Sequence, residues 1–367
     1  AAAAALRRLA PDVAAILIDP FPAFFFSPAS IDAVFDPAAM DAFSRDYKLL
    51  ANQGVRVARG EARGVDPVAR RVSTEKETFD YDALILATGM RLAADEIEGL
   101  NDAGNLSVYE RGHLAALRQR IAEFPGGNVL ISMPGGALRC PPAPYEFALR
   151  FAAMMKERRL TGQVTLLDAW PSPQPDAIGA GLSAALAEER DVIEHVPQVN
   201  LARIDAKARK AHTAEGDVFE YDLLSAIPPN KASSLVADLG IAGPGDMFAE
   251  VDPRVFRTRK HADIFALGDV ARTPYGRSAG AAVGAAENCA REVARMLTGS
   301  APAPESAIAT ACFPITGPEG ALRLETVTTV DAQGAVSIKS DPGNKPSAAS
   351  LARRRAWETA LLKRIFG

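Results

Sequence analysis

Three prolines that closely follow one cysteine restrict the fold of this chain most. Cys140 is followed by Pro141, Pro142 and Pro144. Each proline fixes φ and removes a backbone donor, so neither a helix nor a sheet ladder continues through this stretch. Apolar residues then recur over residues 145–154 with a spacing that suits a helix. The sequence therefore predicts a rigid turn that holds Cys140 just ahead of a helix N-terminus.

This predicted position favours a thiolate at Cys140. The unpaired N–H groups at a helix N-terminus, together with the helix dipole, stabilise negative charge. The alternative is an ordinary core cysteine, because free cysteine is among the most buried residue types. The prolines and the helix favour the reactive thiol. Glu146, at the start of the same helix, is a candidate proton carrier or, equally, an acid that stabilises the helix end.

Composition sets the class of protein. With 367 residues, 48% hydrophobic and 23% charged, the chain is long enough for two or three domains with a substantial core. A net charge of −4 argues against a nucleic-acid surface, which needs a basic patch. No apolar run approaches the roughly 18 to 20 residues of a transmembrane segment. Three cysteines and four histidines show no metal-ligand spacing, so we expect no metal site.

The N-terminal residues have the pattern of half a dinucleotide-binding unit. Residues 1–9 predict a helix, and the apolar residues 13–19 predict a short strand that ends in Asp19. In a βαβ unit of this kind, such an acid hydrogen-bonds a ribose hydroxyl. The simpler alternative is that Asp19 is only the surface end of a strand.

Two further apolar strands end in small residues that let the backbone approach a ligand closely. One runs into the turn Ala87-Thr88-Gly89, and the other delivers Gly268 and Asp269 at its carboxyl end. A carboxylate in that place can accept hydrogen bonds from hydroxyl groups. We therefore expect both strand ends to face one ligand.

A second strand–turn–helix unit opens at residues 128–133. Its turn, residues 134–140, reads PGGALRC where a nicotinamide-binding unit carries G-x-G-x-x-G. Without glycines at the helix start, a pyrophosphate lacks the tight turn that it needs, so we predict no NAD(P) site. A later strand that ends in Asp168 is interpreted as inherited architecture. His195 and His212 are interpreted as surface or hydrogen-bonded residues.

The motif Cys-Pro-Pro-x-Pro-Tyr-Glu at residues 140–146 resembles the surroundings of one redox cysteine in the flavoprotein subunit of flavocytochrome c sulfide dehydrogenase. The Ala-Thr-Gly turn and the Gly-Asp pair resemble motifs of the wider FAD-dependent pyridine nucleotide-disulfide oxidoreductases. The resemblance covers nearly the whole chain. In this family a first strand and its glycine-rich loop precede the position of Ala1, so we expect the chain to lack them.

The resemblance implies an α/β fold with two Rossmann-like dinucleotide-binding-type domains and a small β-rich C-terminal domain. The FAD domain would be discontinuous, over residues 1–107 and 241–300. The second Rossmann-like domain, without an NAD site, would cover residues 108–240. The C-terminal interface domain would cover residues 301–367, and its last helix would pack on a domain or a partner rather than on a membrane.

The resemblance also implies a site for FAD. The residues that it assigns to this site are Asp19, Ser27, Val57, Ala87, Thr88, Gly89, Gly268 and Asp269. Some members of the family bond the flavin covalently through a cysteine, and this chain has Ser27 at that place. Because a hydroxyl lacks the nucleophilicity of a thiolate, we expect FAD to be bound non-covalently.

Finally, the resemblance implies the chemistry. It matches Cys312 to the second redox cysteine, so Cys140 and Cys312 would form a disulfide, while Cys289, in an alanine-rich helix, would stay unpaired in the core. The implied activity is a periplasmic, FAD-dependent sulfide dehydrogenase that passes electrons to a c-type cytochrome subunit. Two alternatives stay open: a membrane-associated sulfide:quinone reductase, and a truncated, non-enzymatic fragment unable to bind FAD.

Overall fold

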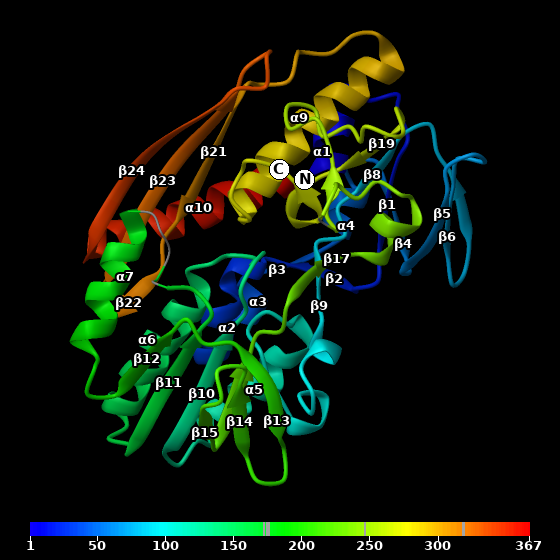
Figure 1. Ribbon diagram of the computed structural model, residues 1–367. Coiled ribbons are helices and arrows are strands. Elements are labelled where there is room, and N and C mark those ends of the chain that lie inside the picture. Colours follow the sequence, from blue (N-terminus) through cyan, green and yellow to red (C-terminus); the bar gives the residue numbers. More distant parts are fainter. Residues whose placement is uncertain (172, 174–176, 246, 318–319) are drawn as a thin grey trace.

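The computed structural model describes residues 1–171, 173, 177–245, 247–317 and 320–367. Helices and strands are both abundant, and the predicted α/β class is confirmed. Figure 1 shows three groups of elements: N-terminal strands with α1 and α9, a parallel sheet with α5, α6 and α7, and long C-terminal strands with α10. One hydrophobic core contacts elements of all three groups.

The strands of the first group come from two stretches of the chain that are far apart in the sequence. β1 (Ala15–Asp19) pairs in parallel with β4 (Val55–Arg59), and β8 (Leu84–Leu86) pairs in parallel with β19 (Ile264–Ala266). Residues near 265 thus return to lie beside residues near 85, as the discontinuous arrangement requires. The Ala87-Thr88-Gly89 turn and the Gly268-Asp269 pair consequently leave the same edge of one sheet.

Two helices cover these strands. α1 (Ala2–Leu9) packs against the long α9 (Ala279–Thr298), and α9 also packs on β21. The contact between α9 and β21 is close because small residues face it: a Cβ atom added at Gly284 would lie 2.7 Å from the side chain of Ile308. Close packing on a sheet is what the alanine-rich and glycine-rich sequence of α9 predicts.

The second group is a four-stranded parallel sheet in the order β12-β11-β10-β16. Its strands are β10 (Gly127–Met133), β11 (Gly162–Asp168), β12 (Ile193–Pro197) and β16 (Leu223–Ala226). The accompanying helices are α5 (Leu114–Ala122), α6 (Ala143–Glu157) and α7 (Ala177–Glu188). The last five residues of each central strand, β10 and β11, are all buried, which is typical of strands covered on both faces.

Short strands and helices complete these two groups. Three-stranded sheets are formed by β5 (Ala62–Asp66), β6 (Arg71–Thr74) and β7 (Thr78–Asp80), and by β13 (Leu201–Asp205), β14 (Lys210–Thr213) and β15 (Val218–Glu220). Two-stranded ribbons are formed by β2 (Ala23–Phe25) with β3 (Ser44–Asp46), and by β18 (Ala249–Glu250) with β20 (Ala271–Arg272). The short helices are α2 (Ser30–Phe35), α3 (Ala39–Ala42), α4 (Lys48–Ala51) and α8 (Ser234–Asp238). β9 (Met90–Leu92) and β17 (Asn230–Ala232) also pair, so the two passages of the chain between the groups lie side by side.

The third group is an antiparallel sheet closed by the last helix. Its strands are β21 (Ala307–Cys312), β22 (Ile315–Gly317), β23 (Gly320–Val330) and β24 (Val336–Ser347). α10 (Ala348–Phe366) packs on this sheet and on α9, and it buries Leu361, Leu362, Ile365 and Phe366. The expected packing of the tail on the rest of the chain is thus confirmed. Among the described residues, no helix combines the length and apolar character that a membrane crossing requires.

Candidate functional site

The backbone around Cys140 forms the predicted turn. Cys140 has a φ of +47°, a strained value for a residue with a side chain. Three hydrogen bonds hold this conformation. The amide of Cys140 donates to the carbonyl of Arg277 at 2.9 Å, and its carbonyl accepts from the hydroxyl of Tyr109 and the amide of Ala143, each at 2.9 Å. Because α6 begins at Ala143, the cysteine lies directly ahead of a helix, as expected.

The prediction that this position favours a thiolate is wrong. The pKa of the Cys140 thiol is raised to about 11, first by burial and then by the nearby carboxylate of Glu146. Arg139 and Arg354 act in the opposite direction and lower this pKa, but they do not outweigh burial. Burial is therefore the largest influence on the charge of this thiol.

Glu146 is not a free acid in the first turn of α6. Its carboxylate accepts a hydrogen bond of 2.6 Å from the guanidinium of Arg354, which belongs to the C-terminal helix. Burial raises the pKa of Glu146, whereas Arg354 and Arg150 lower it. The structure thus adds ion pairing with α10 to the two roles that the sequence suggested, proton carrier and helix-stabilising acid.

Cys312 is the last residue of β21 and pairs with Leu324 of β23. The carbonyl of the next residue, Phe313, accepts a hydrogen bond of 3.1 Å from Arg354. Cys140 and Cys312 are both partly buried and pack against the main core. Cys289 is fully buried in α9, and burial raises its pKa, which confirms its interpretation as a core residue.

A hollow lies where β19 ends and α9 begins. It is lined by Phe256, Gly268, Asp269, Thr273, Tyr275, Gly276, Arg277, Ser278, Ala281, Ala282 and Ala285. Gly268 has a φ of +72°, which residues with side chains rarely adopt. Burial raises the pKa of Asp269, and Arg139 and Arg277 lower it. The structure thus places the predicted Gly-Asp pair in a hollow at the start of a 20-residue helix.

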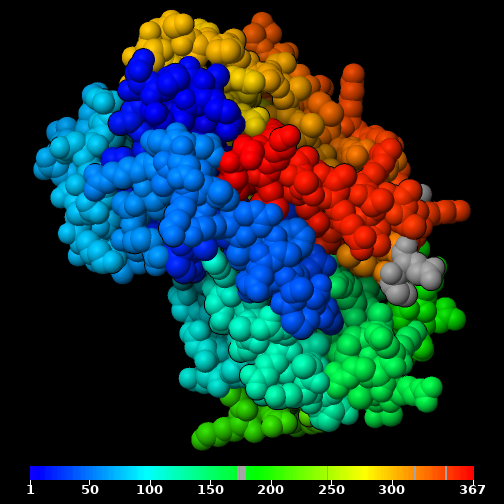
Figure 2. Space-filling model, turned by 180° about the vertical axis from the view of Figure 1, so that it is seen from behind, coloured from blue at the N-terminus to red at the C-terminus, as the bar shows by residue number. Residues whose placement is uncertain are grey.

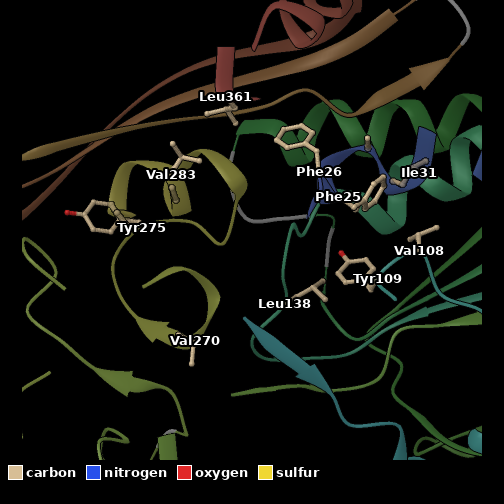
Figure 3. Close-up of a cluster of buried hydrophobic side chains, with 14 of the residues drawn as sticks. Phe25, Phe26, Ile31, Val108, Tyr109, Leu138, Val270, Tyr275, Val283 and Leu361 are labelled. Carbon is tan, nitrogen blue, oxygen red and sulfur yellow. The ribbon is translucent and has the colours of Figure 1, made fainter. Parts of the chain in front are cut away.

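Cys140 is tied to the wall of this hollow. Its amide is bonded to Arg277, and the charge of Asp269 acts on its thiol. Figure 3 shows Tyr109 and Leu138, on the cysteine side, and Val270 and Tyr275, from the segment that leads into α9. Two motifs more than 120 residues apart in the sequence therefore meet in one place.

The other residues predicted for the cofactor occupy two places. Ala87 and Thr88 are exposed at the end of β8, and Gly89 has a φ of +67° with no atom near the position of an added Cβ. They lie beside the Gly-Asp pair, because β8 and β19 are neighbours. Asp19 ends β1, on the other parallel pair, and its carboxylate accepts from the amide of Phe21 at 2.8 Å.

The remaining two predicted positions are Val57 and Ser27. Val57 is half-buried in β4, opposite Leu17 of β1. Ser27 is exposed at the first position of a short 3₁₀-helix (Ser27–Ala29). Within the described residues, the pair β1 and β4 and the pair β8 and β19 are separate two-stranded sheets. Asp19 and Val57 lie on the first pair, five of the predicted residues follow the strands of the second, and Ser27 lies on neither.

Asp168, the acid at the end of β11, is committed to an internal network. It is fully buried, and its carboxylate accepts from the hydroxyl of Tyr145 at 2.6 Å and from the amide of Trp170 at 2.8 Å. The ring of His195 lies 3.0 Å from the same carboxylate, so this histidine is hydrogen-bonded, as predicted. A buried carboxylate that already has these three hydrogen-bond partners is not available to accept a hydrogen bond from a ribose hydroxyl.

Sequence reasoning missed three residues of this site: Tyr109, Arg139 and Arg354. Arg139 lies over the ring of Tyr109 at 5.2 Å and donates to its carbonyl at 2.6 Å. Arg354 could have been found from the sequence. Arg354 and Glu358 continue the helical spacing of Leu361 and Ile365, so all four residues lie on the buried face of α10. A charged pair on an apolar helix face signals buried partners.

Comparison with known proteins gives one family match and several relatives. Residues 114–228 match the family model described as "Sulfide dehydrogenase [flavocytochrome c] flavoprotein chain, central". The mitochondrial sulfide:quinone oxidoreductase of Dictyostelium discoideum is 25% identical over 220 residues, which are 57% of this chain and 48% of that protein. The nitric oxide reductase FlRd-NAD(+) reductase of Aeromonas hydrophila is 29% identical over 217 residues, 56% of this chain and 50% of the other. The match spans about half the length of these relatives.

Solved structures extend the likeness to the whole chain. The sulfide:quinone oxidoreductase of Aquifex aeolicus superimposes with a TM-score of 0.77 at 21% identity and covers 100% of this chain and 88% of its own. A ferredoxin reductase of Rhodopseudomonas palustris gives a TM-score of 0.71 at 18% identity, over 90% of this chain and 79% of its own. The chain therefore has the fold that these two reductases share, and its central part is similar to that of the sulfide dehydrogenase flavoprotein.

Proposed function

We propose that this chain is an FAD-dependent oxidoreductase that oxidises sulfide through a redox-active pair, Cys140 and Cys312. The observation that carries the proposal is the hydrogen bond between Cys140 and Arg277, because Arg277 lines the hollow that contains Gly268 and Asp269. A thiol held on a strained turn thereby lies beside the place proposed for the cofactor. The similarity of the central residues to a sulfide dehydrogenase flavoprotein supports the choice of substrate.

The residues of this chain fit FAD at the ends of β8 and β19. Gly89 and Gly268 both have positive φ and no side chain, so the backbone is open to close approach. Asp269 would accept hydrogen bonds from the ribityl hydroxyls, and the start of α9 favours the negative charge of the pyrophosphate. Asp19 would hold the ribose. Ser27 offers only a hydroxyl, so we propose non-covalent binding. When bound, FAD accepts an electron pair and can release the electrons singly.

The proposed division of the chain follows from this site. The FAD-binding part would comprise residues 1–107 and 241–300, the second Rossmann-like part residues 108–240, and the C-terminal part residues 301–367. The pairing of β8 with β19 supports the discontinuous first part. The hydrogen bonds of Asp168 support a second part without a nicotinamide site.

The chemistry proposed for the cysteines is disulfide exchange with sulfide. Hydrosulfide attacks one sulfur of the Cys140–Cys312 disulfide, the S–S bond breaks, and a persulfide forms on the attacked cysteine while the other leaves as a thiolate. Arg139 and Arg354 offset part of the cost of a buried charge at Cys140. A thiolate formed there is poorly solvated, and it therefore gives up its electron pair readily.

Two electron acceptors are proposed. The first is a c-type cytochrome in the periplasm, which suits a donor that releases single electrons. The second is a quinone, supported by the likeness to several sulfide:quinone oxidoreductases. An assay that offers cytochrome c or a short-chain quinone to the sulfide-reduced protein separates the two by the rate of flavin reoxidation.

The decisive test begins with the colour of the purified protein. A flavoprotein absorbs between about 350 and 500 nm, and sulfide added without oxygen should bleach this absorbance. The variant Cys140→Ser should keep the colour and lose the bleaching. A colourless protein would indicate the non-enzymatic alternative, and full bleaching of Cys140→Ser would show that the proposed mechanism is wrong.

A further inference from the structure

The side chain of Arg354 joins four segments of the chain. It is 7% exposed, and each nitrogen of its guanidinium has an acceptor. Nε donates to Glu358 at 3.0 Å, and Nη2 donates to Asp32 at 2.5 Å. Nη1 donates both to Glu146 at 2.6 Å and to the carbonyl of Phe313 at 3.1 Å. The planar fork of arginine suits such a set of acceptors, and the single ammonium of lysine does not.

The charges around Arg354 do not balance. Arg354 and Arg150 face three carboxylates, those of Asp32, Glu146 and Glu358. Arg150 lies 2.6 Å from Asp32 but 3.9 Å from Glu146, so Arg354 is the closer partner of Glu146. Burying such a cluster costs desolvation energy and adds little stability compared with apolar packing. What a saturated buried cluster does provide is a fixed geometry.

The fixed segments are those that carry the two cysteines. Glu146 lies in the first turn of the helix that follows Cys140, and Phe313 directly follows Cys312. One nitrogen of Arg354 bonds to both. Figure 2 shows the C-terminal residues, coloured red, between the N-terminal residues in blue and the middle of the chain in green. α10 therefore lies where the segments must be held together.

We propose that Arg354 is a positioning residue for the cysteine pair: it fixes the strand end that carries Cys312 against the helix that follows Cys140, and so favours their disulfide over the two thiols. The inference rests on the pairing in the proposed function. A disulfide needs Cα atoms about 4.4–6.8 Å apart, and segments that drift relative to each other meet this requirement less often. Loss of Arg354 should therefore weaken the disulfide.

The test is an equilibrium with glutathione in the full-length chain carrying Cys289→Ala, so that Cys140 and Cys312 are the only thiols. In the reaction, the dithiol and oxidised glutathione give the protein disulfide and two molecules of reduced glutathione. We expect Arg354→Met to lower the equilibrium constant at least about tenfold, the effect of losing a buried charge-assisted hydrogen bond. Arg354→Lys, which keeps the charge and loses the fork, should lie between this variant and the parent.

Arg150→Met is the matched control. Arg150 belongs to α6 and donates to Asp32 at 2.6 Å, but it comes only within 3.9 Å of Glu146. Its loss therefore leaves the bonds of Arg354 to Glu146 and to Phe313 in place. We expect it to change the equilibrium constant by no more than about threefold. Circular dichroism checks that each variant is folded.

The outcomes of this experiment distinguish a failure of the positioning role from a failure of the cysteine pairing. If folded Arg354→Met shifts the equilibrium no more than Arg150→Met does, the positioning role is overturned. Should Arg354→Met fail to fold, an unchanged equilibrium in folded Arg354→Lys overturns it equally. If the parent forms no bond between Cys140 and Cys312, as judged by mass spectrometry of non-reduced peptides, then the pairing in the proposed function fails as well.

Discussion

In the reduced protein, Cys140 should ionise only at high pH. Its thiol pKa of about 11 lies two units above the ordinary value of 9.0. At pH 8, a pKa of 11 leaves roughly one thiol in a thousand ionised, compared with roughly one in ten at a pKa of 9. A more basic thiolate is also more nucleophilic. At a Brønsted slope of about 0.4–0.5, a pKa that is two units higher makes each thiolate roughly eightfold more reactive. Alkylation at pH 8 should thus be about tenfold slower than for an ordinary thiol.

The assay uses iodoacetamide and a chain in which Cys289→Ala and Cys312→Ser leave Cys140 as the only thiol. The midpoint of the pH–rate profile reports the pKa, whereas the absolute rate also reports access. The same protein in urea is the control, because there the midpoint should return to about 9. A midpoint at or below about 9 in the folded protein would refute the conclusion that burial outweighs the helix N-terminus and the two arginines.

The same shift has a consequence for stability. Between pH 9 and pH 11, the unfolded chain loses its Cys140 proton while the folded chain keeps it. The folded state then binds more protons, so the contribution of this group to the free energy of unfolding falls as pH rises. The full loss is about 3 kcal/mol for two pKa units, complete above about pH 11. Denaturant titrations of the reduced protein and of Cys140→Ala should show this difference between pH 8 and pH 11.

Three further predictions concern the same site. Glu146→Gln removes the carboxylate that raises the pKa of Cys140, so the midpoint of its alkylation profile should move below about 11; an unmoved midpoint would mean that burial acts alone. Because Ser27 cannot link the flavin, acid precipitation should leave the yellow colour in solution, and colour in the pellet would contradict this. Since Asp168 is held by Tyr145 and the turn lacks cradle glycines, NADH at micromolar concentration should not bleach the flavin; rapid bleaching would contradict this.

The sequence predicted those parts of the molecule that depend on neighbours along the chain. Prolines after Cys140 define the turn, and α6 begins within it, because a proline acts on the two or three residues around it. The apolar runs ending at Asp19, Asp168 and Ala87 are strands, as their patterns indicate. Helices α1 and α9 lie where the apolar and small residues recur.

The charge state of the site could not be predicted in this way. The pKa of Cys140 depends on how deeply the turn is buried, and burial depends on segments that lie far along the chain. The carboxylate of Glu146 meets an arginine 208 positions later, and that of Asp32 meets it 322 positions later. No local pattern specifies such pairs. Periodicity shows only that Arg354 lies on the buried face of α10, and the partners require the fold.

The turn at Cys140 and the hydrogen bonds of Asp168 are linked through one helix, α6. In a strand–turn–helix unit that binds a dinucleotide, glycines at the turn admit the pyrophosphate and the acid of the next strand holds the ribose. Here prolines stiffen the turn, and the hydroxyl of Tyr145, in the first turn of the helix, donates to that acid at 2.6 Å. The residue that blocks the acid thus lies on the helix that orients the thiol. Tyr145→Phe should free one lone pair of Asp168 without restoring the cradle, so nucleotide binding should still be undetectable by calorimetry. Binding of NADH to this single variant would show that the tyrosine, and not the turn, excludes the dinucleotide.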